Sequence, residues 1–328
     1  MLSFDKQSDK DILVAKIYSD ADEMKPHGEI YFVNKHKGKS LIEHNDYRSV
    51  LASDELFLKK KYTLTETEYQ QLVSLASKNS ELDPDTDRTL KRAYLDIRTR
   101  LQNKMRREIV FDEEDKIYLR INYDTTKPKT NMIVSVFGAS GSGKSFSVCQ
   151  LLLRDPSVMH YERIYLIGTV GEDDPSYQPL RDAYPEKFEF INTSDLTAND
   201  LKIAPYKHSC IILDDIDSEP ERIVRKNVQL FRDRLLQTAR HYSIRVINTA
   251  HRFNSYHETS KMRNSSKFIG IFPRSIQHTL IQILEKEYQY SSKDAMRLVR
   301  LCKRDGRLTM LRRQHPALLC TPKRIILL

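Results

Sequence analysis

Several residue types that mark particular protein classes are absent or scarce in this sequence. Its 328 residues include no tryptophan, nine glycines and four cysteines. The cysteines are far apart and form no CxxC or Cys/His cluster, so we expect no zinc site and a reducing compartment. No stretch approaches the roughly 20 apolar residues that span a bilayer, and the N-terminus lacks an apolar signal core. We therefore expect neither a membrane segment nor secretion.

Acidic residues are outnumbered by basic ones. The sequence holds 54 Lys and Arg against 45 Asp and Glu, which gives a formal net charge of +9. A basic chain suits a polyanionic partner, most simply nucleic acid, although many basic proteins bind none. The length suits one large domain or two domains of ordinary size.

The pattern of expected secondary structure changes near residue 127. Before this point, short strand-like runs over 12–18 and 29–33 are joined by a hairpin-like connection. Residues 124–130 resemble a boundary, with a proline between two lysines. We interpret residues 1–127 as a smaller α+β accessory domain.

Two helices are predicted within the accessory domain. Thr65 and Glu68 form a capping box, in which each side chain can bond an amide that the helix leaves unpaired. The second helix follows a turn at 83–87, with one apolar stripe and many Lys and Arg on its other faces. Those faces are either solvated or in contact with nucleic acid or another subunit.

Residues 128–328 form an α/β pattern that we interpret as a second domain. Helical stretches, notably 144–153 and 221–239, separate short strand-like runs. The runs over 132–137, 210–213 and 245–248 are nearly all apolar, as strands buried on both faces should be. Alternating strands and helices predict a mainly parallel sheet flanked by helices. The candidate strands are 132–137, 163–167, 210–213, 245–248 and 268–272.

One third of the glycines lie in a single short loop. The run from Gly138 to Ser145 fits G-x-x-x-x-G-K-[ST] in full, between an apolar strand and a helix. Such a loop points its amides at phosphate oxygens, while Lys144 can reach the β- and γ-phosphates and Ser145 can bind Mg²⁺. The pattern predicts a P-loop NTPase of the ASCE/RecA-like type that binds ATP and Mg²⁺. The expected nucleotide-binding residues are Gly138, Ala139, Ser140, Gly141, Ser142, Gly143, Lys144, Ser145 and Phe146.

A second apolar run ends in two carboxylates, Asp214 and Asp215. Asp214, at the end of the strand, is expected to coordinate Mg²⁺ directly or through water. Asp215 is then placed to act as the general base that polarises the attacking water.

ATP hydrolysis also requires a group that senses the γ-phosphate and a cation that offsets the charge of the transition state. Asn248 or Thr249 would lie beside the phosphates if the strand over 245–248 lies between the two motif strands. Otherwise these residues form an ordinary strand end. The cation candidates are Arg240, Arg252 and Arg263, and a neighbouring subunit can supply such an arginine.

Several motifs together resemble the genome-packaging ATPases of large double-stranded DNA viruses, a poxvirus-type branch of the FtsK–HerA P-loop ATPases. The resemblance covers about residues 131 to 275. Two departures from the family pattern stand out, because Ala239 replaces the usual glycine and the sensor glutamine is absent. Besides the P-loop and the acidic pair, the matching residues are Asp174, Pro175 and Tyr177, the segment 235–241, His251-Arg252 and the segment 262–265.

The resemblance implies a DNA translocase that packages a viral genome. It implies a ring-shaped homo-oligomer, a pentamer or hexamer, around double-stranded DNA, with ATP at the subunit interfaces and Arg240 acting in trans. It also implies capsid or portal partners and a location in the host cytoplasm or viral factory, or in the virion. Pore contacts would go to phosphates, and Arg222, Arg225 and Lys226 are candidates unless they are merely solvated.

Two other functions fit the same motifs. One is a helicase-like or AAA-type ATPase in replication or recombination, acting on single strands or on protein. The other is a nucleotide-dependent nucleic-acid-binding switch with little turnover. The acidic pair argues against the switch, because a protein that only binds nucleotide needs no general base.

Overall fold

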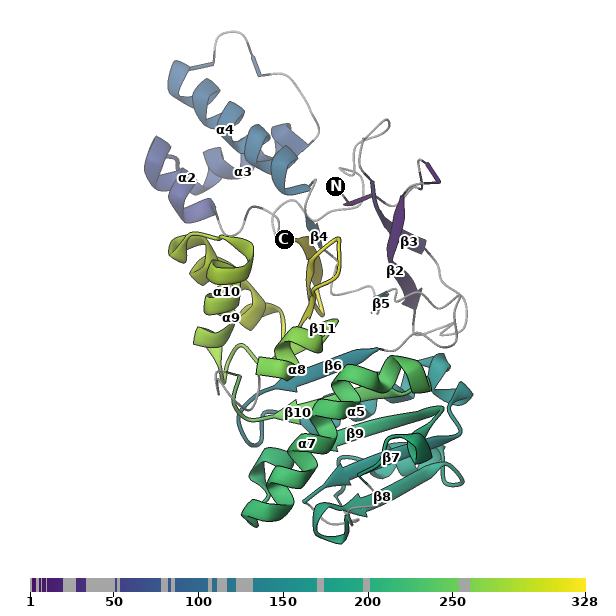
Figure 1. The fold of residues 1–328 in the computed structure, drawn as a ribbon. Coiled ribbons are helices and arrows are strands. Elements are labelled where there is room, and N and C mark those ends of the chain that lie inside the picture. The colour runs from purple at the N-terminus through teal and green to yellow at the C-terminus, as the bar shows by residue number, and fades with distance from the viewer. Residues whose placement is uncertain are drawn as a thin grey trace. The chain divides into compact units, whose positions relative to one another are not determined.

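The computed structural model describes most of the chain. The described residues are 2–3, 6, 8–9, 11–19, 28–33, 51, 54–77, 82–83, 86–105, 108–110, 117–121, 132–169, 174–196, 201–253 and 260–328. They belong to two compact units (Figure 1). The first unit combines residues within 1–122 with 304–306 and 316–328, and the second combines 123–303 with 307–315. The predicted boundary at 127/128 lies outside the described residues and stays a prediction.

The second unit is built on a mostly parallel sheet, visible in Figure 1 as the succession β11, β6, β10, β9, β7 and β8. These strands are parallel to their neighbours, and β12 pairs with β11 in the antiparallel sense. The α/β class and the mainly parallel sheet predicted from the sequence are confirmed. The strands are β6 (Ile133–Phe137), β7 (Arg163–Gly168), β8 (Phe188–Asn192), β9 (Ser209–Asp214), β10 (Arg245–Ala250), β11 (Phe268–Ile271) and β12 (Thr309–Arg312).

Every residue of β6, β9, β10 and β11 is buried. Strands covered on both faces need mostly apolar residues, which explains the apolar sequences of β6 and β11 and the apolar centre of β9. β10 differs in that it also buries Arg245, Asn248 and Thr249. β10 lies between β6 and β9, with Val246 opposite Ile133 on one side and Ile211 on the other. The carboxyl ends of these three strands therefore meet at one edge of the sheet.

Helices follow the strands of the second unit. α5 begins at the end of the glycine-rich loop and contacts β6 and β10. α7 buries Val228, Phe231 and Leu235, and the Phe231 ring lies 5.3 Å from that of Tyr206. The α-helices are α5 (Lys144–Leu153), α6 (Gln178–Ala183), α7 (Arg222–Thr238), α8 (Ser260–Ser265), α9 (Gln277–Tyr288) and α10 (Ser292–Asp305). The short 3₁₀ helices are η2 (Pro156–His160), η3 (Thr193–Asp195), η4 (Ala204–Tyr206), η5 (Ile216–Ser218) and η6 (Ala239–Tyr242).

The first unit contains an antiparallel sheet, a group of helices and a pair of late strands. The sheet has the order β1-β3-β2-β5, and α2, α3 and α4 share a core that includes Leu72, Tyr94 and Ile97. β14 pairs with β13 on one side and with β4 on the other. The elements are β1 (Leu2–Ser3), β2 (Ile12–Ser19), β3 (Gly28–Phe32), α2 (Glu55–Tyr62), α3 (Glu66–Ser77), α4 (Arg88–Met105), β4 (Glu108–Val110), β5 (Ile117–Ile121), β13 (Leu318–Thr321) and β14 (Arg324–Leu327).

The local signals of the first unit are confirmed. Glu68 accepts from the amide of Thr65 at 2.8 Å, and its own amide donates to the Thr65 hydroxyl at 3.3 Å, which is the predicted capping box. Asp87 caps α4 by accepting from the amide of Thr89 at 2.6 Å. None of the described helices is both long and apolar enough to cross a membrane.

Buried charges hold the late strands of the first unit. The guanidinium of Arg324 is bound by Asp305, with Nη2 3.0 Å from Oδ1, and by Glu108. All three side chains are almost fully buried. Charges removed from water need partners of this kind, because an unpaired buried charge is strongly destabilising.

Candidate nucleotide site

The glycine-rich loop connects β6 to α5. Gly141 and Gly143 have positive φ values of 70° and 98°, which side chains with a Cβ rarely adopt. Position 138 requires glycine for a different reason. A Cβ there would lie 2.5 Å from the Ser142 hydroxyl and 2.8 Å from the Phe272 ring. The three glycines thus have separate structural reasons, and together they give the tight turn that phosphate-binding loops require.

The loop leads directly into the first turn of α5, which begins at Lys144. Residues 139–141 are exposed. Ser275 accepts from the amide of Ala139 at 3.4 Å and fixes the start of the loop. Phe146 belongs to the first turn, where backbone amides are free to bind an anion, and its side chain is 58% exposed. Open amides at a helix start are suited to a negatively charged ligand.

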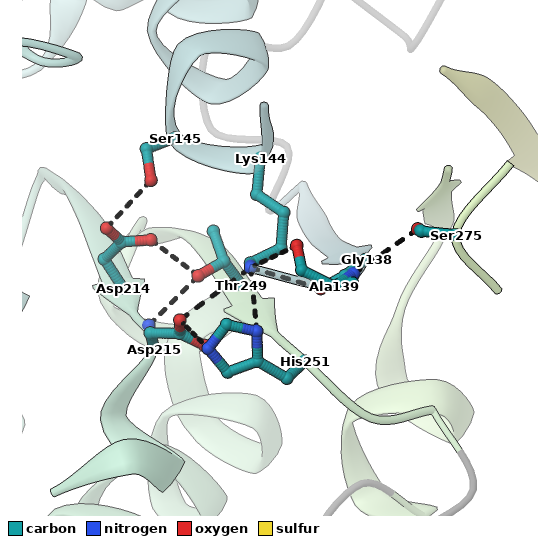
Figure 2. Close-up of polar contacts among 9 residues, drawn as sticks. All are labelled: Gly138, Ala139, Lys144, Ser145, Asp214, Asp215, Thr249, His251 and Ser275. Carbon is teal, nitrogen blue, oxygen red and sulfur yellow. Dashed lines mark hydrogen bonds and ion pairs between the residues drawn. The ribbon is translucent and has the colours of Figure 1, made fainter. Parts of the chain in front are cut away.

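The buried Lys144 side chain returns toward the loop (Figure 2). Its Nζ donates to the carbonyl of Gly138 at 3.1 Å and to that of Ala139 at 3.4 Å. Nζ also lies 3.1 Å from Nδ1 of His251 and 3.8 Å from Oδ2 of Asp215. The ammonium group is therefore held at the edge of the sheet where β6, β9 and β10 end.

The two predicted metal ligands lie together. The hydroxyl of Ser145 donates to Oδ2 of Asp214 at 3.2 Å, and Thr249 donates to Oδ1 at 2.6 Å. Burial raises the pKa of the Asp214 carboxyl, and the hydrogen bond from Thr249 opposes this shift. Burial raises the pKa of Tyr177 well above its usual value, and the neighbouring charge of Asp214 acts in the same direction. Ser145 and Asp214 offer adjacent hard oxygens at the head of the loop.

Asp215 occupies an unusual backbone conformation, with φ of 52°. Positive φ is uncommon for residues other than glycine, and Asp is among those that tolerate it. One carboxylate oxygen, Oδ2, pairs with Nε2 of His251 and lies near Lys144, whereas Oδ1 is buried with no hydrogen bond from the described residues. Burial raises the pKa of the Asp215 carboxyl, while Lys144 and His251 act in the opposite direction.

The two predicted sensor residues have different surroundings. Thr249 joins the site, because its hydroxyl bonds Asp214 and accepts from the amide of Asp215 at 3.0 Å. Asn248 is buried, and its amide group has no hydrogen bond to any described residue. Successive side chains of a strand point to opposite faces, so Asn248 points away from the face that carries Thr249. The structure brings only one of the pair to the acids.

The candidate arginines lie outside this cluster. Arg240 is exposed in η6, which precedes the amino end of β10, and its Nε donates to Nε2 of His241 at 3.2 Å. That is the opposite edge of the parallel sheet from Lys144. Arg252 is exposed, and the Arg263 guanidinium lies 5.0 Å from the centre of the Phe253 ring.

His251 is the site residue that the sequence analysis did not select. It follows β10 directly, and its ring lies between Lys144 and Asp215 (Figure 2). Two signals pointed to this position: it is a polar residue after an apolar strand, and His251-Arg252 is part of the family resemblance. Periodicity alone does not identify which polar residue after a strand turns toward the loop.

The residues present fit a magnesium–nucleotide complex. Mg²⁺ prefers oxygen ligands and is usually held by one or two carboxylates together with substrate phosphates and water. Ser145 and Asp214 supply such oxygens 3.2 Å apart, and the described residues contain no group of three or more His, Cys, Asp or Glu that would form a separate metal cage. The loop amides, Lys144 and the start of α5 supply the complement for phosphate.

No protein-family model matches this chain, and no curated protein matches it in sequence. Similar solved structures include the genome packaging NTPase B204 from Sulfolobus turreted icosahedral virus 2, bound to sulfate. It shares 17% identity over 56% of this chain and 92% of its own, with a TM-score of 0.38. B204, the DNA-packaging ATPase from Sulfolobus turreted icosahedral virus, shares 19% identity over 56% and 92%, with a TM-score of 0.36.

A further similar structure is EssC (ATPases 2 and 3) from Geobacillus thermodenitrificans. It shares 14% identity over 67% of this chain, which spans 43% of the EssC structure, with a TM-score of 0.36. At these identities and TM-scores, what such proteins bind or move does not transfer to this chain. The functional assignment therefore rests on the residues around Lys144 and Asp214.

Proposed function

We propose that this chain is a magnesium-dependent ATPase. The observation that carries the proposal is that the loop and the acidic strand meet at one edge of the sheet. Ser145 lies 3.2 Å from Asp214, and Lys144 lies 3.8 Å from Asp215. A loop that served only as a turn would have no need of two acids opposite its lysine.

Each side chain has a role in the proposed reaction. The loop amides and Lys144 bind phosphate oxygens, and Ser145 and Asp214 hold the metal. Asp215 orients and polarises the attacking water. When bound, Mg²⁺ neutralises charge that develops on the phosphate oxygens. Thr249 fixes both acids through its hydroxyl.

We further propose that ATP hydrolysis moves double-stranded DNA during packaging of a viral genome. The sequence motifs that resemble packaging ATPases and the net charge of +9 support this function. The proposal includes a ring of identical subunits, five or six in number, with capsid or portal proteins as partners. It places the protein in the host cytoplasm or viral factory, or in the virion.

Arg240 is proposed to act in the site of a neighbouring subunit. Within its own chain it lies at the amino end of β10, away from Lys144, and it is exposed. An arginine that is supplied in trans needs this combination of exposure and distance from its own site.

The ATPase proposal is tested by Lys144→Ala. Loss of a charged donor aimed at the phosphates should lower ATP hydrolysis by about 100-fold or more, with an unchanged circular dichroism spectrum. Lys202→Ala, at an exposed lysine of the same unit, is the matched control and should hydrolyse ATP like the wild type. Undiminished turnover in Lys144→Ala would remove the enzyme assignment.

The DNA proposal is tested by measuring the ATPase rate with long duplex DNA, with single-stranded DNA and without nucleic acid, across a salt series. Duplex-selective stimulation that fades with added salt is expected, since phosphate contacts weaken as salt rises. Stimulation by single strands would favour the helicase-like function, and slow turnover under every condition would favour the switch.

A further inference from the structure

The imidazole of His251 joins the two halves of the site. β10 lies between the strand that carries the loop and the strand that carries the acids. The first residue after β10 therefore emerges between Lys144 and Asp215, where Figure 2 shows the ring. The side chain is 34% exposed, compared with 6% for Lys144, so it is the more accessible of the two.

Both ring nitrogens of His251 are in use. Nδ1 lies 3.1 Å from Nζ of Lys144, and Nε2 pairs with Oδ2 of Asp215. An ammonium group can only donate, so Nδ1 must accept. The neutral tautomer with its hydrogen on Nε2 satisfies both contacts at once. His251 is thus an acceptor toward the loop lysine and a donor toward the acid.

The ammonium of Lys144 has three hydrogens, and three acceptors of the described residues lie within hydrogen-bond distance of it. They are the carbonyls of Gly138 and Ala139, at 3.1 and 3.4 Å, and the ring of His251. A phosphate oxygen that binds Lys144 must take over one of these bonds. The two carbonyls are part of the loop backbone, whereas the histidine is a partly exposed side chain. The bond to His251 is the one that can be exchanged with least rearrangement.

The orientation of Asp215 depends on the same ring. Its Oδ1 has no hydrogen bond from the described residues, and its contacts with His251 and Lys144 both fall on Oδ2. If Lys144 turns toward a phosphate, His251 is the remaining side chain that fixes the direction of the carboxylate.

Neither residue predicted from the sequence as a sensor can perform this exchange. Thr249 is bonded to Asp214 and to the amide of Asp215. Asn248 forms no hydrogen bond with the loop or the acids.

We propose that His251 is a positioning residue that bridges Lys144 and Asp215, gives up its bond to Lys144 when a terminal phosphate binds, and then holds Asp215 in place for hydrolysis. The inference rests on the proposed ATPase function and identifies how that site responds to the phosphate. His251 would have two opposite effects. Its ring competes with the phosphate for Lys144, and it also supports Asp215, the general base.

The test compares His251→Ala, His251→Gln and the wild type. Binding of ADP and of a non-hydrolysable ATP analogue is measured by calorimetry with Mg²⁺, and kcat is measured for ATP. For His251→Ala we expect analogue affinity to rise about 3- to 10-fold, since a competing charge-assisted bond is removed, with ADP affinity unchanged. We expect kcat to fall about 10- to 100-fold, because Asp215 loses its support.

His251→Gln provides the conservative variant. A glutamine amide has an acceptor oxygen and a donor nitrogen, so it can replace both ring contacts and should recover most of kcat. His278→Gln, at an exposed histidine on α9, is the matched control and should behave like the wild type.

Other outcomes decide the matter differently. A purely structural role would weaken analogue and ADP binding together in His251→Ala and overturn the proposal. Unchanged affinity and kcat would overturn it as well. Failure of the ATPase function itself would appear separately, as full activity in Lys144→Ala.

Discussion

The hydroxyl of Thr249 donates to Oδ1 of Asp214 at 2.6 Å while accepting from the amide of Asp215 at 3.0 Å. One short side chain therefore fixes the side chain of the first acid and the backbone of the second. Asp215 has a positive φ, and a hydrogen bond to its amide helps to hold that conformation. β10 thus contributes to the site through bonds to Asp214, the last residue of β9, and to Asp215, which follows it.

Thr249→Val removes the hydroxyl and keeps the shape of the side chain. Asp214 is buried and would lose its closest donor, so the carboxylate should be less well oriented for a metal. Loss of a partner that orients a ligand typically lowers metal affinity about 10- to 100-fold. The Mg²⁺ concentration for half-maximal ATPase activity should rise accordingly. Thr249→Ser retains the hydroxyl and should stay near the wild type, and an unchanged Mg²⁺ dependence in the valine variant would contradict the role.

Asp215→Asn separates binding from hydrolysis. The amide keeps the size of the carboxylate but is not a base, so ATP should still bind while single-turnover hydrolysis falls about 100-fold or more. Nucleotide titration and a quenched time course measure the two steps. Loss of ATP binding would instead indicate that Asp215 is structural or a metal ligand.

Mixed assemblies test the position of Arg240. If this arginine enters the neighbouring site, each Arg240→Ala subunit should impair a site that its own chain does not form. Mixing Arg240→Ala with Lys144→Ala subunits should then restore ATPase activity, because an intact loop on one subunit can receive the arginine of a Lys144→Ala neighbour. Absence of any recovery across the mixing ratios would show that Arg240 acts within its own chain.

The buried thiol of Cys210 should make the free energy of unfolding depend on pH. Burial raises the pKa of Cys210 to about 12, from a usual value of 9.0. Above pH 9 the unfolded chain loses this proton while the folded chain retains it, so the free energy of unfolding should fall as pH rises and be unaffected below that point. Urea unfolding between pH 7.5 and 10 should show a steeper loss in the wild type than in Cys210→Ala. Parallel curves would contradict the burial of the thiol.

The central sheet could be predicted because its signals are local. Its strands are short runs rich in apolar residues, and five strands were expected within a few residues of β6, β7, β9, β10 and β11. α3 and α4 could be predicted equally well, since the Thr65–Glu68 capping box and the apolar stripe each depend on residues that are close in sequence. Such features depend on neighbours in sequence.

The remaining features depend on partners far away in sequence. The sequence alone could not decide whether Asn248 or Thr249 points to the acids. Adjacent side chains point to opposite faces of the strand, so the answer depends on how β10 pairs with its neighbours. His251 was missed for the same reason. The roles of Lys144, Asp214 and Asp215 were assigned from the motif, and they stay predictions that the variants above test.

The pairing of β14 with β4 has a consequence for how the protein is made. Glu108 and Arg324 are separated by 216 positions along the chain, so a ribosome must complete the whole second unit before this strand pair can form. The unit that begins first during synthesis is thus the one finished last. Until β14 is synthesised, the edge of β4 that pairs with it stays unpaired. Pairing of the two strands is expected to be slow, because the contact closes so long a loop.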